Sequence, residues 1–124
     1  MDRHYKGYKT RIDSFMYAFS GIRTMLVEEP NAWIHAAITV IVIIAGFYCK
    51  LTMMEWCWIV LSIVSVWTAE ALNTAFESLA DVASPKFHPM VEKAKDVAAG
   101  AVLITSIGSA IVGLLVLGPH FFHP

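Results

Sequence analysis

Long apolar runs alternate with polar segments along this chain of 124 residues. The first run, at residues 32–49, reads AWIHAAITVIVIIAGFYC and contains no Asp, Glu, Lys or Arg. A second run begins near Met54, and a third covers residues 97–118. A helix needs about 17–25 predominantly apolar residues to cross the hydrocarbon core of a bilayer. The pattern therefore predicts three transmembrane helices, at about residues 32–49, 54–72 and 97–118.

The first 29 residues show a different pattern, in which large apolar side chains recur every three or four positions. This spacing places them on one helix face: Tyr5, Tyr8, Ile12, Phe15, Met16, Phe19, Ile22 and Leu26. The other faces carry Lys and Arg, so residues 1–29 are predicted to form a basic amphipathic helix in the membrane surface. A helix that packs on a soluble partner is a weaker alternative because a membrane span follows at once.

The composition agrees with a membrane protein. Hydrophobic residues make up 57% of the chain and charged residues 15%, and the mean hydropathy is +0.61. Soluble domains contain about 45–50% apolar and about 25% charged residues. We therefore expect a small all-α integral membrane protein with one domain. The net charge of −1 gives no sign of a polyanion-binding surface, so no nucleic-acid partner is expected.

The distribution of Lys and Arg predicts the orientation in the membrane. Five precede the first span, one lies in the connection at 50–53, and three lie in the segment 82–96. Cytoplasmic segments carry the excess of basic residues, so the N-terminus and the segment 82–96 are predicted to be cytoplasmic.

Small side chains recur every four residues in the third span, at Ala101, Thr105, Ser109 and Gly113. Such a strip lets helix backbones approach closely in lipid. Three thin helices enclose little protein interior, so we expect a homo-oligomer.

Four polar side chains follow the second apolar run, in the segment AEALNTAFESLAD at residues 69–81. Glu70, Asn73, Glu77 and Asp81 share one helix face over about three turns. A charged Asp near bilayer depth costs roughly 2.5–3.5 kcal/mol on insertion scales, and such carboxylates are tolerated where they face protein, water, a cation or a substrate. Glu70, nearest the hydrocarbon, is therefore a candidate general base. The alternative is that the four residues are the solvated end of a helix leaving the membrane.

Other charged residues are predicted at the same cytoplasmic level. Glu28 and Glu29 precede the first span, and Lys93, Lys95 and Asp96 precede the third. Two carboxylates can hold Mg²⁺ when phosphates and water supply the other oxygen ligands, and a Lys can bind phosphate as a point charge. The chain lacks the GxxxxGK[ST] and GxGxxG motifs. The residues thus leave two functions open: metal-dependent phosphoryl transfer to a lipid headgroup, or translocation of protons or small cations.

The segment AEALNTAFESLAD, followed by HPMVEKAKDVAAGAVLI, resembles the prokaryotic diacylglycerol kinase family, including its undecaprenol kinase branch. The resemblance covers about residues 11–117, and its fixed positions are all present: Glu70, Asn73, Thr74, Ala75, Glu77, Asp81, Ala94, Lys95, Asp96 and Ala99 to Val102. It implies a homotrimer of three-span protomers in the bacterial cell membrane, with active sites between protomers at the cytoplasmic interface. The implied reaction transfers the γ-phosphoryl group of ATP to a lipid alcohol. The FHP loop, His35 and AKDVAAGAV favour undecaprenol as that alcohol, with diacylglycerol as the alternative.

The resemblance also implies roles for individual residues. Glu70 is the expected general base, and Glu29 and Glu77 are the expected Mg²⁺ ligands. Glu29 is chosen over the adjacent Glu28 by its distance from Gly21. The remaining implied ATP contacts are Arg11, Tyr17, Asn73, Asp81, Lys86, His88, Lys95 and Asp96.

For the N-terminal nucleotide contact, Thr10 is the alternative to Arg11, because the alignment there is uncertain by one residue. The implied lipid contacts, besides Glu70, are Arg23, Trp33, His35 and Ala99. For two of these residues a purely structural role is the alternative. Trp33 could be an interfacial anchor, and His35 could be a buried hydrogen-bonding residue rather than a substrate gate.

Overall fold

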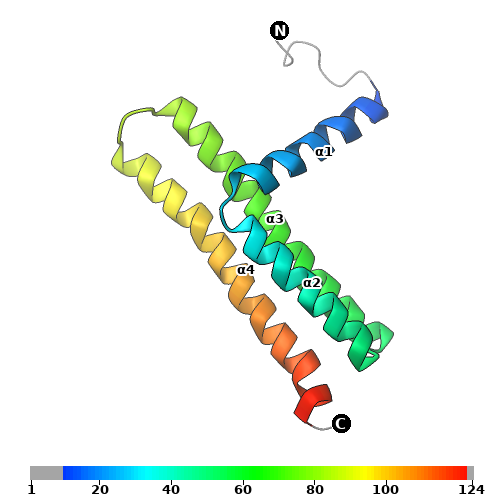
Figure 1. The fold of residues 1–124 in the computed structure, drawn as a ribbon. Helices are drawn as coiled ribbons and strands as arrows, with labels where there is room; N and C mark the ends of the chain where they lie inside the picture. Colours follow the sequence, from blue (N-terminus) through cyan, green and yellow to red (C-terminus); the bar gives the residue numbers. More distant parts are fainter. Residues whose placement is uncertain (1–9, 123–124) are drawn as a thin grey trace.

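The computed structural model describes residues 10–122, which form four α-helices (Figure 1): α1 (Arg11–Glu28), α2 (Ala32–Cys49), α3 (Met53–Ala83) and α4 (Pro89–Phe122). All regular structure in this part of the chain is helical, in agreement with the predicted all-α class. The helix predicted for residues 1–29 corresponds to α1, and the first nine residues of that prediction lie outside the described residues.

Helices α2, α3 and α4 lie side by side, and α1 leaves this bundle at a steep angle (Figure 1). Helix α1 meets the bundle at the turn of residues 29–31, close to the middle of α3. Beyond this turn, α3 and α4 continue past the start of α2. The upper halves of α3 and α4 thus project from the three-helix part of the molecule, and their connection at residues 84–88 lies far from the start of α1.

The connection between α2 and α3 is short, and hydrogen bonds at both helix ends fix its conformation. Lys50 ends α2 in the left-handed conformation (φ 53°, ψ 55°), and Leu51 N–H donates to Gly46 C=O at 3.2 Å. Thr52 and Glu55 then form a reciprocal capping box at the start of α3, with N–H···O distances of 3.2 and 3.0 Å. These caps satisfy backbone groups that a helix end would otherwise leave unpaired, so α2 and α3 form a tight antiparallel hairpin.

Two helices are longer than the apolar runs within them. Helix α3 continues to Ala83, well beyond the predicted membrane boundary at residue 72, because the segment after it still has high helix propensity. Helix α4 begins at Pro89 and passes through Pro119 to Phe122. Pro119 is tolerated near the last turn because it removes only one backbone hydrogen bond there. The helical parts outside the apolar runs carry the polar residues discussed below.

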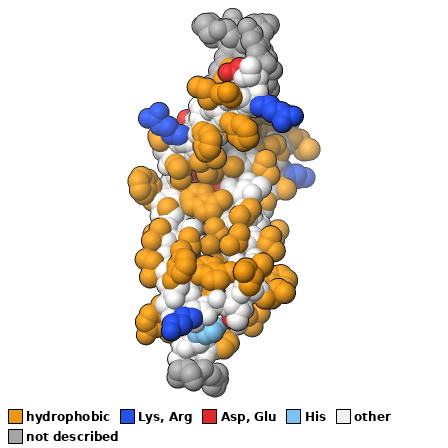
Figure 2. All heavy atoms as spheres, turned by 90° about the vertical axis from the view of Figure 1, so that its right-hand side faces the viewer, with side chains coloured by type: hydrophobic (Ala, Val, Ile, Leu, Met, Phe, Trp, Pro, Cys, Tyr) orange, Lys and Arg blue, Asp and Glu red, His pale blue; other side chains and the backbone are white. Residues whose placement is uncertain are grey.

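The exposed surface is largely apolar. Helices α2, α3 and α4 are each long and apolar enough to span a membrane. Figure 2 shows hydrophobic side chains covering the middle of the molecule, with Lys and Arg visible above and below this region. Large side chains such as Trp33, Ile44 and Leu114 are more than half exposed, and α4 buries none of its residues within the described chain. Such a surface requires lipid or another protein around it, so this is a multi-pass membrane protein.

At Gly46 the side chain of Trp56 from α3 packs directly on the backbone of α2. A Cβ atom at this position would lie 2.5 Å from Cη2 of Trp56, whose ring also packs on Phe47 with centroids 5.0 Å apart. We predict that Gly46→Ala lowers the free energy of unfolding by about 1–3 kcal/mol because the large indole must move out of a packed position. Thermal unfolding of the detergent-solubilised protein would measure this.

The matched control is Gly21→Ala in α1, where a Cβ atom meets nothing within 4 Å. This variant should be neutral or slightly stabilising, because Ala has the higher helix propensity. Equal unfolding temperatures for the Gly46 variant and the wild type would contradict the packing account.

Candidate active site

Three glutamates approach one another where α3 passes the turn between α1 and α2. Glu29 lies in that turn, and Glu70 and Glu77 lie two helical turns apart on α3. Glu70 is only 1% exposed and Glu29 8% exposed. Both Glu29 and Glu77 interact electrostatically with the Glu70 carboxyl. The structure therefore gathers the expected base and the two expected metal ligands in one acidic cluster: Glu29, Glu70 and Glu77.

Thr74 links the turn to α3. Its hydroxyl lies 2.9 Å from the Glu70 carbonyl oxygen and 3.4 Å from Oε2 of Glu29. Since the hydroxyl has one proton, the bond to the nearer carbonyl is the stronger of the two. Glu29 is buried beside α3, whereas the neighbouring Glu28 is exposed. The two adjacent carboxylates thus lie in different environments.

The imidazole of His35 on α2 contacts the Glu70 carboxyl group. Its Nε2 lies 2.8 Å from Oε1 of Glu70, and the two side chains are 16% and 1% exposed. A buried polar group without a partner costs several kcal/mol, so this contact stabilises the buried carboxyl group. The pair has ion-pair distance, but among the described residues neither Glu70 oxygen has a hydrogen bond of good geometry. His35 Nε2 approaches Oε1, and Oε2 is left for another partner.

A second buried acceptor lies next along the same face. Asn73 donates from Nδ2 to Oε1 of Glu77 at 3.3 Å, while its own Oδ1 is buried and has no hydrogen-bond partner in the described part of the chain. Buried oxygens of this kind call for a ligand, an ion or water. Glu70 and Asn73 thus present unsatisfied oxygen atoms on the face that the sequence predicted.

The donors in the cluster fit a hard cation that is shared with phosphate. Carboxylate oxygens are the ligands that Mg²⁺ prefers, and this ion usually takes one or two of them with phosphate and water. Within residues 10–122, no group of three or more His, Cys, Asp and Glu side chains is arranged so that it could hold a metal ion by itself.

Asp81 and Lys95 connect the projecting parts of α3 and α4. Lys95 Nζ donates to Oδ1 of Asp81 at 2.6 Å. This hydrogen bond raises the pKa of the Lys95 ammonium, which lies outside the predicted span and remains positively charged. The two motifs recognised in the sequence thus meet in space, and Lys95 adds positive charge one turn beyond Glu77.

The other expected site residues lie on the surface of the single chain. Tyr17 is half-buried, and the exposed ones are Arg11, Arg23, Trp33, Lys86, His88, Asp96 and Ala99. Arg11, at the start of α1, and the loop of Lys86 and His88, between α3 and α4, lie on opposite sides of the molecule (Figure 1). One chain therefore does not bring all the expected ATP contacts together.

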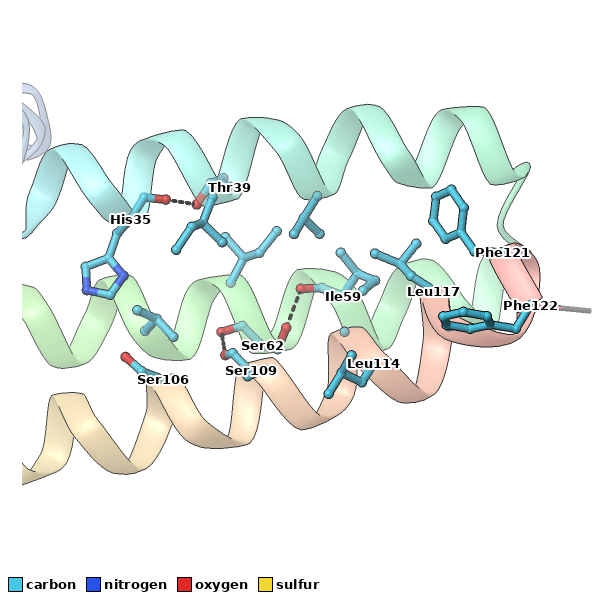
Figure 3. A pocket seen from close by; sticks show the side chains of 17 residues that line it. His35, Thr39, Ile59, Ser62, Ser106, Ser109, Leu114, Leu117, Phe121 and Phe122 are labelled. Atoms are coloured by element: carbon cyan, nitrogen blue, oxygen red, sulfur yellow. Dashed lines mark hydrogen bonds between the residues drawn. The ribbon is translucent and has the colours of Figure 1, made fainter.

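An apolar groove runs from His35 along the bundle between α2, α3 and α4. Figure 3 shows His35 at one end of it and Phe121 and Phe122 at the other. Its volume is about 610 Å³, within the range of ligand pockets. His35 thus touches the groove on one side and Glu70 on the other.

Two residues beside His35 were not predicted from the sequence. Trp67 Nε1 donates to Thr39 Oγ1 at 3.1 Å, and Thr39 Oγ1 donates to the His35 carbonyl at 2.7 Å. Thr39 lies four residues after His35 and Trp67 three before Glu70, so each shares a helix face with a predicted site residue. This spacing could have indicated Thr39 and Trp67 as site residues. Whether their side chains meet, however, depends on the register of α2 against α3.

Three membrane-spanning helices with a buried acidic cluster beside an apolar groove define a membrane protein whose site can meet both lipid and water-soluble groups. The sequence model of the prokaryotic diacylglycerol kinase family matches residues 16–117, and the chain belongs to this family. The match includes α2, α3 and most of α4, as well as the whole acidic cluster. The family resemblance inferred from the sequence is confirmed.

Several relatives support this membership. The chain is 42% identical over 106 residues to the undecaprenol kinase of Bacillus subtilis, covering 86% of each protein. It is 36% identical over 107 residues to a diacylglycerol kinase of Synechocystis sp., covering 86% of this chain and 61% of that one. It is 24% identical over 115 residues to the diacylglycerol kinase of Escherichia coli K12, covering 93% and 94%.

Proposed function

We propose that the protein is a lipid kinase that transfers the γ-phosphoryl group of ATP to undecaprenol and so forms undecaprenyl phosphate. The substrate assignment is supported by the 42% identity to an undecaprenol kinase, and diacylglycerol is the alternative because other relatives are diacylglycerol kinases. The observation that carries the proposal is the buried carboxylate of Glu70. It lies between the apolar groove on the His35 side and the acidic cluster of Glu29 and Glu77.

Glu70 acts as the general base. As the lipid oxygen attacks the γ-phosphorus, its O–H proton passes to the carboxylate, the new O–P bond forms, and the bond to the β-phosphate oxygen breaks to release ADP. Oε2 of Glu70 is the suitable acceptor because it is buried and unpaired among the described residues, whereas Oε1 faces His35. With Glu70 only 1% exposed, a neighbouring side chain must move for the hydroxyl to reach it.

Glu29 and Glu77 would hold Mg²⁺ together with phosphate oxygens. When bound, this ion supplies neutralisation of the charge on the β- and γ-phosphates. Asn73 holds Glu77 by a 3.3 Å hydrogen bond and Thr74 lies beside Glu29, so both carboxylates are positioned from α3. This arrangement suits a reaction in which positioning and charge neutralisation provide most of the rate enhancement.

The ATP site extends from this cluster along the projecting parts of α3 and α4. Lys95, oriented by Asp81, is placed to contact phosphate, and Asn73 and Asp96 complete this side. The remaining contacts come from Arg11 and Tyr17 on α1 and from Lys86 and His88 in the loop. Since Arg11 and the loop lie apart within one chain, a site between protomers of a homotrimer accounts for their joint role.

The lipid approaches from the membrane side. Helix α1 would lie in the membrane surface, where Arg23 meets headgroups and the exposed Ile12, Phe15, Met16 and Phe19 enter the acyl region. Trp33, His35 and Ala99 would contact the lipid itself. The distribution of basic residues supports a cytoplasmic N-terminus in the bacterial cell membrane. Glu70 then lies where a membrane-embedded hydroxyl and cytoplasmic ATP can meet.

The proposal predicts that Glu70→Gln lowers kcat by about 100-fold or more, because the amide cannot accept the hydroxyl proton. Transfer of labelled γ-phosphate from ATP to undecaprenol in detergent would be measured with Mg²⁺, with diacylglycerol assayed in parallel. Glu92→Gln, at an exposed position in the first turn of α4, is the control and should keep the wild-type rate.

Wild-type turnover in the Glu70 variant would show that another group accepts the proton. Faster phosphorylation of diacylglycerol than of undecaprenol by the wild type would reverse the substrate assignment. A wild type that phosphorylates neither lipid but moves protons or cations into liposomes would replace the kinase proposal with the translocator.

The adjacent pair Glu28 and Glu29 offers a direct test of the metal site. Glu29→Gln should raise the Mg²⁺ concentration needed for half-maximal activity about tenfold or more, since it removes a charged ligand. Glu28→Gln should leave the Mg²⁺ requirement unchanged because its side chain is exposed. Magnesium titrations of both variants at saturating ATP would distinguish them, and equal shifts would argue against Glu29 as the ligand.

A further inference from the structure

We infer that Trp67 and Thr39 are positioning residues that hold the general base in its reactive orientation by acting through His35. The inference rests on the proposed role of Glu70 and adds residues that neither the sequence motifs nor the family resemblance single out. It begins from an interhelical chain of contacts that ends at the Glu70 carboxyl: Trp67, Thr39, His35 and Glu70.

Thr39 is the centre of this chain. Its hydroxyl donates its single proton to the His35 carbonyl at 2.7 Å and accepts the indole N–H of Trp67 at 3.1 Å. Figure 3 shows the contact between Thr39 and His35 on α2. Both bonds are short and use the hydroxyl in complementary roles. Trp67 is therefore fixed relative to the backbone of His35, across the interface of α2 and α3.

The imidazole of His35 lies between Trp67 and Glu70. Its ring meets the indole in an edge-on arrangement, with centroids 6.2 Å apart and planes at 66°, and its Nε2 lies 2.8 Å from Oε1 of Glu70. Trp67 and Glu70 are one helical turn apart on α3, so both reach the same ring from neighbouring turns. The indole limits the rotation of the imidazole, and the imidazole fixes one carboxylate oxygen.

This arrangement gives the two oxygens of Glu70 different tasks. Oε1 lies 2.8 Å from the His35 imidazole, while Oε2 has no hydrogen-bond partner in the described residues and can accept from the lipid hydroxyl once a neighbouring side chain moves. A proton acceptor must lie within hydrogen-bond reach of the attacking hydroxyl, and a displacement of about 1 Å can reduce turnover about 100-fold. Loss of the indole N–H would free the imidazole and, with it, the carboxylate.

Trp67→Phe and Thr39→Val test this inference because each removes one link while keeping an apolar side chain of similar shape. Each should lower kcat for undecaprenol about tenfold and leave the KM values for MgATP and lipid within about twofold, since binding groups are untouched. The controls are Trp58→Phe, at an exposed indole on α3, and Thr105→Val, whose hydroxyl bonds only to carbonyls of its own helix. Both should keep the wild-type kcat.

Two further measurements separate positioning from a loss of folding. In a His35→Ala background, Trp67→Phe should cause no additional loss of kcat, because the residues act in series. In the protein labelled with ¹⁵N-histidine, the ring signals of His35 should change in Trp67→Phe and Thr39→Val but not in the two controls. This readout does not require activity, so it remains decisive if the wild type phosphorylates neither lipid and the proposed function fails.

A wild-type kcat in Trp67→Phe, an equal loss of kcat in the presence and absence of His35, or unchanged His35 signals would each overturn the inference. Rates are to be compared only among variants that elute at the wild-type position in gel filtration. Should Trp67→Phe not fold, Thr39→Val alone decides the same questions.

Discussion

The contact between Glu70 and His35 is the constraint on which the rest of this structure depends. A carboxylate that is 1% exposed inside a membrane protein is stable only with a partner, and His35 on α2 is the partner placed 2.8 Å away. The contact joins α2 to α3. At the same level Glu29, in the turn before α2, lies beside Thr74 of α3. The acidic cluster thus lies at the start of α2, next to the contact that links the two helices.

In the proposed function the cluster lies at the boundary between membrane and water, and the unequal lengths of the helices suit that position. Helix α2 starts at the level of the cluster, whereas α3 and α4 continue beyond it and carry Asp81 and Lys95. On one side His35 borders an apolar groove. On the other side the polar residues Asn73 and Glu77 follow along α3, and Lys95 of α4 bonds to Asp81 beyond them. A reaction between a lipid hydroxyl and a nucleotide needs such a boundary, because the lipid remains in the bilayer while the nucleotide remains in water.

Much of this arrangement could be predicted from the sequence, for physical reasons that differ between residues. The spans follow from uninterrupted apolar runs, and the common face of Glu70, Asn73 and Glu77 follows from helical periodicity within one segment. Glu29 was assigned through family resemblance. The role of Thr39 and Trp67 could not be predicted, because it depends on the register between two helices, which membrane helices set through small packing differences. The continuation of α3 through Asp81 follows from the same periodicity and from helix propensity. The polar start of α4 at Pro89 could not be predicted in this way, since a polar extension carries no hydropathy signal.

The compact connection at residues 50–52 has a consequence for biogenesis. A left-handed Lys50 and a capping box close α2 onto α3 with only three residues between the helices. Closing so short a loop costs little chain entropy, and contacts near in sequence form quickly. The two helices can therefore enter the bilayer as a preformed hairpin while α4 is still being synthesised. His35 and Glu70, at the open end of this hairpin, would then already be in contact when the hairpin enters the lipid.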